Sequence, residues 1–303
     1  MSESNKRNFI VHGSILAIAG ILVRIIGMLY RIPVVNIIGS EGNGIYGAAF
    51  NIYNIMLVLS SYGLPMAVSK LVSARFTKKR YKSAAKVLRC SLMVAVCTGG
   101  IAALLVFFGA SFIENVIYGG GLPGLAIPLR ILAPTIFLVA ILGVIRGFFQ
   151  GQSTMIPTAV SQILEQIVNA IVSIAAGYGM MKAFASSPDV AAYGAAGSTL
   201  GTAMGALTAV LFMGFLYAVY TPTFNRLKRK DRHTENQSTG QICKIIIYTM
   251  IPIILGQTFY QISALIDDVM FSNIMVGRDI TKSISMDLGN FSSSYSLLIG
   301  IPQ

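Results

Sequence analysis

Long apolar segments alternate with short polar segments along most of the chain. A membrane-spanning helix needs about 20 mainly apolar residues, and most of these segments reach that length. We expect helices at residues 10–38, 45–72, 90–112, 125–149, 158–182, 192–219 and 242–275, and an eighth that starts near residue 286. This pattern predicts an all-α polytopic membrane protein.

The first apolar segment carries two arginines on one face. Gly20, Arg24, Gly27 and Arg31 follow one another at steps of four, three and four, so they share one side of a helix. An arginine at mid-bilayer costs about 2.5–3.5 kcal/mol on insertion scales, and it is tolerated when it faces protein, a counter-charge or water. We interpret the stripe as the lining of a wet, positively charged cavity. The alternative is that Arg24 pairs with a buried carboxylate and only fixes helix packing.

Other segments carry polar stripes at helical spacing, and these are candidates for lining the same cavity. Glu165 is the one acidic residue deep in the first six segments. We expect it to pair with an arginine of the first or fourth segment, with Arg24 or Arg31 as first choices, because an unpaired buried carboxylate is protonated or very costly. The candidate substrate-binding residues are Arg24, Arg31, Asn51, Asn54, Glu165, Gln166, Asn169, Gln261 and Asp268.

Glycines and prolines mark the expected turns, kinks and close contacts. Pro33 is expected to kink the first helix, and Gly39–Gly44 to form a tight external turn. A second external connection, Glu114–Gly124, contains three consecutive glycines and is expected to be flexible. A small-xxx-small run in the sixth segment favours close helix packing. The candidate packing and gating residues are Gly20, Gly27, Pro33, Pro65, Gly197, Gly201 and Gly205.

Composition and charge agree with the membrane class and predict an orientation. Hydrophobic residues make up 54% of the chain and charged residues 11%, whereas soluble domains have about 25% charged residues. Much of the net charge of +12 lies in two short basic runs, residues 75–89 and 226–232. Such runs are typical of cytoplasmic loops, and they should attract anionic lipids rather than nucleic acid. Residues 1–9 are polar and basic and are expected to be cytoplasmic as well.

No residue pattern points to catalysis, a cofactor or a metal ion. The three cysteines and two histidines form no CxxC pair and no metal-ligand spacing. The glycine run Gly119–Gly121 lacks the strand–loop–helix context of a phosphate-binding loop. We therefore expect a protein that is not an enzyme and that uses no metal or cofactor, so the energy for moving any substrate must come from an ion gradient or the membrane potential.

A weak internal repeat indicates two lobes. Gly63 and Pro65 in the second segment are matched by Gly300 and Pro302 in the eighth, an offset of about six helices in the same direction. We expect a first six-helix lobe at residues 10–220, a basic cytoplasmic connection at 221–240 and the first two helices of a second lobe at 241–303. The chain is then expected to be a fragment of a longer protein.

Short motifs in the first five segments resemble those of a known family. They are Arg24-Ile-Ile-Gly27 with Arg31-Ile-Pro33, Tyr62-Gly-Leu-Pro65 with Ser69-Lys70, and Arg146-Gly-Phe-Phe-Gln-Gly151 with Ser161-Gln-Ile-Leu-Glu165-Gln166. Together they resemble the stage V sporulation protein B group. That group belongs with the polysaccharide flippases and the lipid II flippase MurJ, in the superfamily that also contains the MATE exporters.

The resemblance implies a fold and an activity. The family has two six-helix lobes around a central V-shaped cavity, and it moves undecaprenyl-pyrophosphate-linked saccharides across the bacterial cytoplasmic membrane by alternating access. Arginines of the first helices line that cavity; Arg24 matches the first of them, and Arg31 is offset by one residue from the second. The family's arginine early in the eighth helix has no counterpart in residues 286–303, which bears on lipid II as substrate more than on the fold.

Two other functions remain open at this point. A MATE-type exporter of cationic drugs would need acidic cavity residues, for which Glu165, Asp267 and Asp268 are candidates; the cationic first helix argues against it. A membrane scaffold without transport is the third possibility. The buried polar stripes argue against a scaffold, because a scaffold has no need to bury them.

Overall fold

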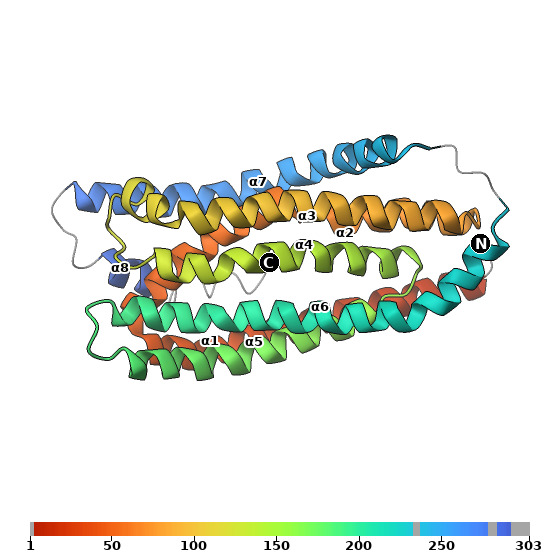
Figure 1. The fold of residues 1–303 in the computed structure, drawn as a ribbon. Helices are drawn as coiled ribbons and strands as arrows, with labels where there is room; N and C mark the ends of the chain where they lie inside the picture. Colours follow the sequence, from red (N-terminus) through yellow and green to blue (C-terminus); the bar gives the residue numbers. More distant parts are fainter. Residues whose placement is uncertain (1–2, 233–236, 278–283, 292–303) are drawn as a thin grey trace.

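The computed structural model describes residues 3–232, 237–277 and 284–291, and within them the chain is helical without strands. The elements are α1 (Glu3–Ser60), α2 (Leu64–Thr77), α3 (Tyr81–Phe112), the π-helix η1 (Ile113–Ile117), α4 (Ala126–Gly151), α5 (Ile156–Ala183), α6 (Val190–Lys230), α7 (Thr239–Val276) and α8 (Ile284–Phe291). Figure 1 shows an elongated bundle whose long helices run along one common direction. The all-α class is confirmed.

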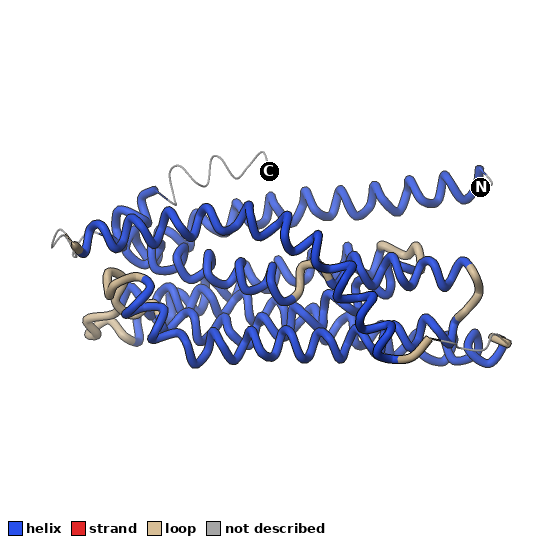
Figure 2. Tube along the Cα trace, turned by 90° about the horizontal axis from the view of Figure 1, so that it is seen from above, coloured by secondary structure: helices blue, strands red, loops and turns tan. Residues whose placement is uncertain are grey.

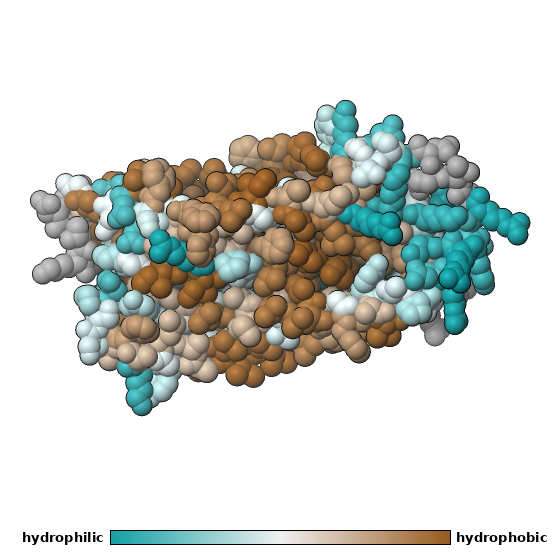
Figure 3. All heavy atoms as spheres, in the orientation of Figure 1, coloured by the Kyte–Doolittle hydropathy of each residue, from teal (hydrophilic) through white to brown (hydrophobic). Residues whose placement is uncertain are grey.

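The apolar segments suit a membrane. Six stretches of the described residues are long and apolar enough to cross one, and the first of them, Gly13–Thr77, is more than long enough for two crossings. Figure 3 shows apolar side chains in a broad band across the middle of the bundle and polar ones at its ends. We call the end that carries Arg75 and Lys230 the basic end, and the end that carries Gly39 the glycine end.

A single glycine reverses the chain inside α1. Gly39 has φ 70° and ψ 178°, the only non-helical backbone within this element, and the two helical parts on either side run in opposite directions (Figure 1). The expected turn over Gly39–Gly44 is therefore wrong, because residues 40–44 are helical. Pro33 lies inside the first helical part, whose backbone stays helical there, and the expected kink at Pro33 stays a prediction. A positive φ is accessible to glycine at little cost, so this single residue is enough to reverse the direction of the chain.

The expected second helix, residues 45–72, is divided near its middle. The second part of α1 ends at Ser60, and α2 begins at Leu64 after a turn in which the Leu64 amide donates to the Ser61 carbonyl at 3.0 Å. Pro65 lies in the first turn of α2, where a missing N–H costs nothing. The break lies beside α7, because a side chain at Gly63 would meet Met250.

Helices are longer at the basic end than their apolar segments. The first helix begins by Glu3 and α3 begins at Tyr81, nine residues before the expected start, while α6 continues to Lys230. The basic runs thus belong mostly to helices rather than to loops. Hydropathy marks where a helix leaves the membrane, but the backbone hydrogen bonds continue into water wherever the residues, here mainly Lys and Arg, are good helix formers.

Two glycine stripes set the closest helix contacts. Gly197, Gly201 and Gly205 of α6 lie against the backbone of α5, where added Cβ atoms would meet its carbonyl oxygens. A second stripe, Gly143, Gly147 and Gly151 of α4, lies against α2 at Pro65, Val68 and Val72. The sequence analysis did not single out this second stripe, although its spacing is the same small-xxx-small pattern.

The connection between α3 and α4 is packed rather than loose. Tyr118 and Leu122 are fully buried, and the Glu114 carboxylate accepts hydrogen bonds from the amides of Gly124 at 3.0 Å and Ala126 at 2.7 Å. A carboxylate at a helix N-terminus satisfies amides that have no partner within the helix. The connection Glu114–Gly124 thus has a defined structure that caps α4, which the flexible-loop prediction missed.

We expect Glu114→Ala to destabilise the protein by about 1–2 kcal/mol, because it removes two charge-assisted bonds from the start of α4. Thermal unfolding of the purified protein in detergent measures this. Asn115→Ala is the matched control, since the Asn115 side-chain amide donates to the Ser111 carbonyl only one turn earlier, at the end of α3. An equal effect of both substitutions would contradict the capping role.

The orientation in the membrane stays a prediction, with the basic end in the cytoplasm. We expect a cysteine at exposed Lys78 to react with an impermeant thiol reagent only after cells are permeabilised. A cysteine at exposed Ser186, near the glycine end, should react in intact cells. The exposed Cys97 is replaced by serine in both variants, and the reverse labelling pattern would contradict this orientation.

Candidate functional site

A polar cavity lies near the glycine end, where both parts of α1 meet α7 and α8. Its volume is about 340 Å³. The lining residues are Tyr30, Arg31, Gly44, Tyr46, Gly47, Ala48, Phe50, Asn51, Asn54, Asp267, Asp268, Leu288 and Phe291. Four of the nine candidate substrate-binding residues therefore line this cavity. They are Arg31, Asn51 and Asn54 of α1 and Asp268 of α7.

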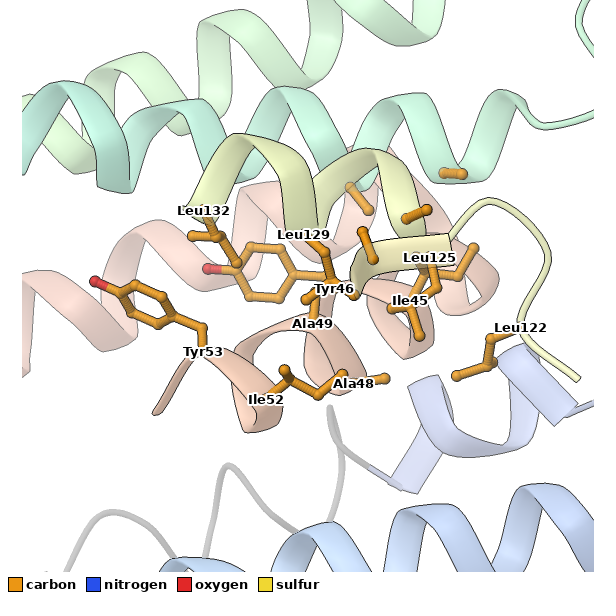
Figure 4. Packing of buried hydrophobic residues seen from close by; sticks show 14 of the residues in the cluster. Ile45, Tyr46, Ala48, Ala49, Ile52, Tyr53, Leu122, Leu125, Leu129 and Leu132 are labelled. Atoms are coloured by element: carbon orange, nitrogen blue, oxygen red, sulfur yellow. The ribbon is translucent and has the colours of Figure 1, made fainter. Parts of the chain in front are cut away.

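Arg31 forms the cationic wall of this cavity. Its guanidinium carbon lies 5.8 Å from the centre of the Tyr46 ring, within the range of a cation–π interaction. The Tyr46 ring packs on Phe50, with ring centres 4.5 Å apart. Figure 4 shows Tyr46 held between α1 and α4, beside Leu129 and Leu132. A packed aromatic ring therefore gives the arginine a fixed neighbour.

Asparagines and carboxylates form the rest of the polar lining. The Asn51 amide donates to the Asp268 carboxylate at 2.5 Å, which ties α1 to α7. Asp267 and Asn54 add two more polar side chains to the wall. The cavity thus presents both signs of charge, together with amides and aromatic faces that suit hydroxyl-rich groups.

Backbones cross at van der Waals distance on one side of the cavity. A side chain at Gly44 would strike the Ser285 carbonyl, and one at Gly289 would strike the Ser40 carbonyl. The buried Asn43 amide donates to the Gly289 carbonyl at 2.9 Å across the same crossing. Glycine at both positions allows α8 to lie directly on α1, and this crossing closes the cavity wall.

Arg24 lies apart from the cavity. Its side chain is exposed, and it makes no hydrogen bond or ion pair with the described part of the chain. The first part of α1 lies at one margin of the bundle (Figure 2), with neighbours such as Ile21 and Ile25 exposed as well. On the adjacent side of this helix, a side chain at Gly27 would come within 3.1 Å of the Gln166 amide nitrogen of α5.

Glu165 pairs with an arginine of the fourth helix, not of the first. Its carboxylate lies 2.7 Å from Arg146 Nη2, and the Arg146 Nε donates to Ser161 Oγ at 2.9 Å. The first choice of Arg24 or Arg31 is thus wrong, and the fourth-segment alternative is right. The two residues are only 19 positions apart, on the consecutive helices α4 and α5. The ion pair therefore forms between helices that are neighbours in the sequence.

Asn169 and Gln261 are not among the cavity residues. Asn169 is buried between helices, where its amide oxygen accepts from Ser173 Oγ at 2.9 Å and its nitrogen donates to the Tyr30 hydroxyl at 3.4 Å. Gln261 is half-buried on α7, one turn toward the basic end from Leu265.

Two expectations about packing and repeats have other outcomes. A Cβ atom added at Gly20, a candidate packing residue, would meet no described atom within 4 Å. Gly300 and Pro302 of the expected repeat fall outside the described residues.

A larger pocket opens at the basic end between α2, α7 and the α4–α5 turn. Its volume is about 890 Å³. The lining residues are Met66, Ser69, Lys70, Ser73, Gln150, Ser153, Met155, Ile245, Tyr248, Thr249, Pro252 and Ile253. Within residues 3–232, 237–277 and 284–291, Lys70 is its one charged residue and no carboxylate lines it. The sequence analysis did not predict this pocket, although Met66, Ser69, Lys70 and Ser73 recur at helical spacing.

Comparison with known proteins places these features in a wider group. A family described as polysaccharide biosynthesis protein matches residues 10–303. Lipid II flippase MurJ of Bacillus subtilis (strain 168) is 34% identical over 176 residues, which are 56% of this chain and 32% of that protein. Stage V sporulation protein B of the same organism is 30% identical over 210 residues, 69% of this chain and 39% of that protein.

A third relative and two solved structures extend the comparison. The uncharacterized membrane protein YabM of B. subtilis is 26% identical over 97% of this chain, and the match covers 53% of its own length. The match thus spans about half the length of YabM and a smaller share of the other two relatives. A transporter of the MOP superfamily from Pyrococcus furiosus has a TM-score of 0.62 at 16% identity, covering 92% of this chain and 62% of that one. A MATE structure has the same TM-score at 14% identity, covering 98% and 71%. These likenesses show the fold.

Proposed function

Because the chain belongs to the polysaccharide biosynthesis protein family, we propose that the protein moves undecaprenyl-pyrophosphate-linked saccharides across the bacterial cytoplasmic membrane by alternating access. The relative named as a lipid II flippase supports this class of substrate. The full protein would combine the lobe of α1–α6 with a second lobe that α7 and α8 begin.

The observation that carries the proposal is a series of three cations spaced along α1 and α2. Lys70 lies in the basic-end pocket, Arg24 in the middle of the first part of α1, and Arg31 in the cavity near the glycine end. A pyrophosphate is doubly charged or more, and charge-assisted hydrogen bonds to it are about twice as strong as neutral ones. The three cations therefore provide successive partners for an anionic head group as it crosses.

The saccharide has partners in the same places. Asn51, Asn54 and the rings of Tyr46 and Phe50 line the cavity, and Gln150 and Tyr248 line the basic-end pocket. Amides bond sugar hydroxyls, and aromatic faces cover the apolar face of a sugar ring. In this proposal the polyprenyl tail stays in the bilayer while the head group crosses.

A second candidate function rests on the acidic pair in the cavity. Asp267 and Asp268 face the space that Arg31 also lines, and carboxylates suit a coupling cation or a cationic drug. This feature favours a MATE-type, cation-coupled exporter. It is compatible with the first proposal if the cation is the coupling ion and not the substrate.

Transport by the full-length protein in proteoliposomes distinguishes the two functions. We expect translocation of an undecaprenyl-pyrophosphate-linked saccharide, measured as loss of its accessibility to an impermeant sugar-modifying enzyme, and no uptake of a cationic dye. A protein-free liposome and an unrelated membrane protein are the controls. Dye uptake without saccharide translocation would contradict the flippase and support the exporter.

A further inference from the structure

A second charged groove lies at the basic end, away from the proposed transport path. It is formed by the start of α3, the end of α6 and the first residue of α7, and its volume is about 490 Å³. The lining residues are Lys82, Ala85, Lys86, Arg89, Cys90, Met93, Lys228 and Thr239. We call this set the basic groove.

Among the described residues, four cations and no carboxylate line the basic groove. Lys82, Lys86 and Arg89 project from successive turns of α3, and Lys228 faces them from α6. In the described part of the chain, an acid that contacts this region is Asp231, which is buried, and its carboxylate accepts from the Lys82 backbone amide at 2.8 Å. Asp231 thus caps α3, and the four side-chain charges leave a strongly positive groove.

Two of the four cations are held in place by neutral partners. The Lys86 ammonium donates to the Gln237 carbonyl, and the Lys228 ammonium lies 5.2 Å from the centre of the Phe224 ring. Neutral partners position an ammonium without removing its charge. The groove is therefore pre-organised for an anion, which lowers the entropy cost of binding one.

An exposed apolar stripe continues from the groove along α3 toward the middle of the bundle. It begins at Met93, which also lines the groove, and its members are 47% to 76% exposed. The stripe consists of Met93, Val96, Ile101, Leu104 and Phe108. A cationic site at the edge of the apolar band, with an apolar track leading from it, has the two parts that an acidic phospholipid needs.

We propose that the basic groove binds the phosphate head group of an anionic phospholipid of the cytoplasmic leaflet, with an acyl chain along the α3 stripe. The groove also contacts the segment that joins α6 to α7, through Gln237 and Thr239. A lipid bound there bridges the two lobes at their connection. This inference does not rest on the proposed transport activity.

Lipid binding to the full-length protein tests this site. Native mass spectrometry counts phosphatidylglycerol and phosphatidylcholine retained by wild type, by Arg89→Gln with Lys228→Gln, and by Arg229→Gln with Lys230→Gln. The last pair removes the same charge from two exposed residues at the end of α6 that do not line the groove. We expect the groove pair to weaken phosphatidylglycerol binding roughly 30-fold, at about 1 kcal/mol for each cation, and the flanking pair to weaken it several-fold less.

The alternatives give distinct results. Equal losses in both pairs would show only diffuse attraction to the surface and would overturn the site. Equal binding of phosphatidylglycerol and phosphatidylcholine by wild type would do the same. Inorganic phosphate at millimolar concentration is the third arm: complete displacement of the lipid by it would assign the groove to a free anion and overturn the lipid assignment.

Discussion

Replacing Arg24 with alanine in the full-length protein should abolish translocation of the lipid-linked saccharide while leaving membrane insertion intact. Removal of a cation from mid-bilayer lowers the cost of insertion by about 2.5–3.5 kcal/mol on insertion scales, so a loss of activity cannot be attributed to failed insertion. Arg24 makes no hydrogen bond or ion pair with the described part of the chain, and its loss therefore leaves no internal partner uncompensated. What it removes is a partner for the pyrophosphate.

Complementation of a flippase-deficient strain measures this effect, with protein level in the membrane determined in parallel. Arg24→Lys should restore only part of the activity, because an ammonium lacks the planar fork that contacts two phosphate oxygens. Arg130→Ala is the matched control: Arg130 is an exposed arginine of another apolar helix, bonded to Ser111, and lies outside both pockets. Full activity of Arg24→Ala at normal expression would contradict the cationic path and favour the exporter.

The largest effect on stability is expected at the pair of Arg146 and Glu165. Breaking a buried ion pair by removing one partner costs about 3–5 kcal/mol, because the other charge stays buried without compensation. The two side chains are 14% and 26% exposed, so we expect Glu165→Gln to fall toward the lower end of this range. Arg146→Gln should have a similar cost, and it also removes the bond to Ser161.

The double variant, Arg146→Gln with Glu165→Gln, identifies the cause. It should recover much of the lost stability, since neither charge remains, and the difference from the sum of the single effects gives the coupling between the residues. Thermal unfolding in detergent provides all the values. Glu41→Gln, an exposed carboxylate, should change stability little, and additive effects of the two main substitutions would show that the pair does not stabilise the fold.

The membrane class and most helix positions follow from the sequence because the bilayer imposes them. A spanning segment must satisfy its backbone internally and be apolar over a set length, and both requirements can be read locally. The helices α4 and α5 accordingly begin and end within two residues of their expected bounds. The ends of α3 and α6 could not be predicted in this way, since their basic turns lie beyond the apolar band, where hydropathy no longer indicates where a helix stops.

The candidate site was predictable in part. Helical spacing identified Arg31, Asn51, Asn54 and Asp268 as polar residues on apolar helices, and the structure brings these four to one cavity. The same reasoning also selected Asn169, whose partners lie on α1, α5 and α6. A polar residue on a helix face has the same sequence signature whether it faces a cavity or bonds to a neighbouring helix.

What the sequence alone determined is thus the set of apolar helices, their polar faces and the family. Only the tertiary structure decided which helix lies beside which. Glu165 therefore pairs with Arg146 of α4 and not with α1, and α8 crosses α1 at Gly44 and Gly289. The physical reason is the range of each interaction: lipid solvation and backbone hydrogen bonding act within one helix, whereas an ion pair or a glycine contact depends on which second helix packs against the first.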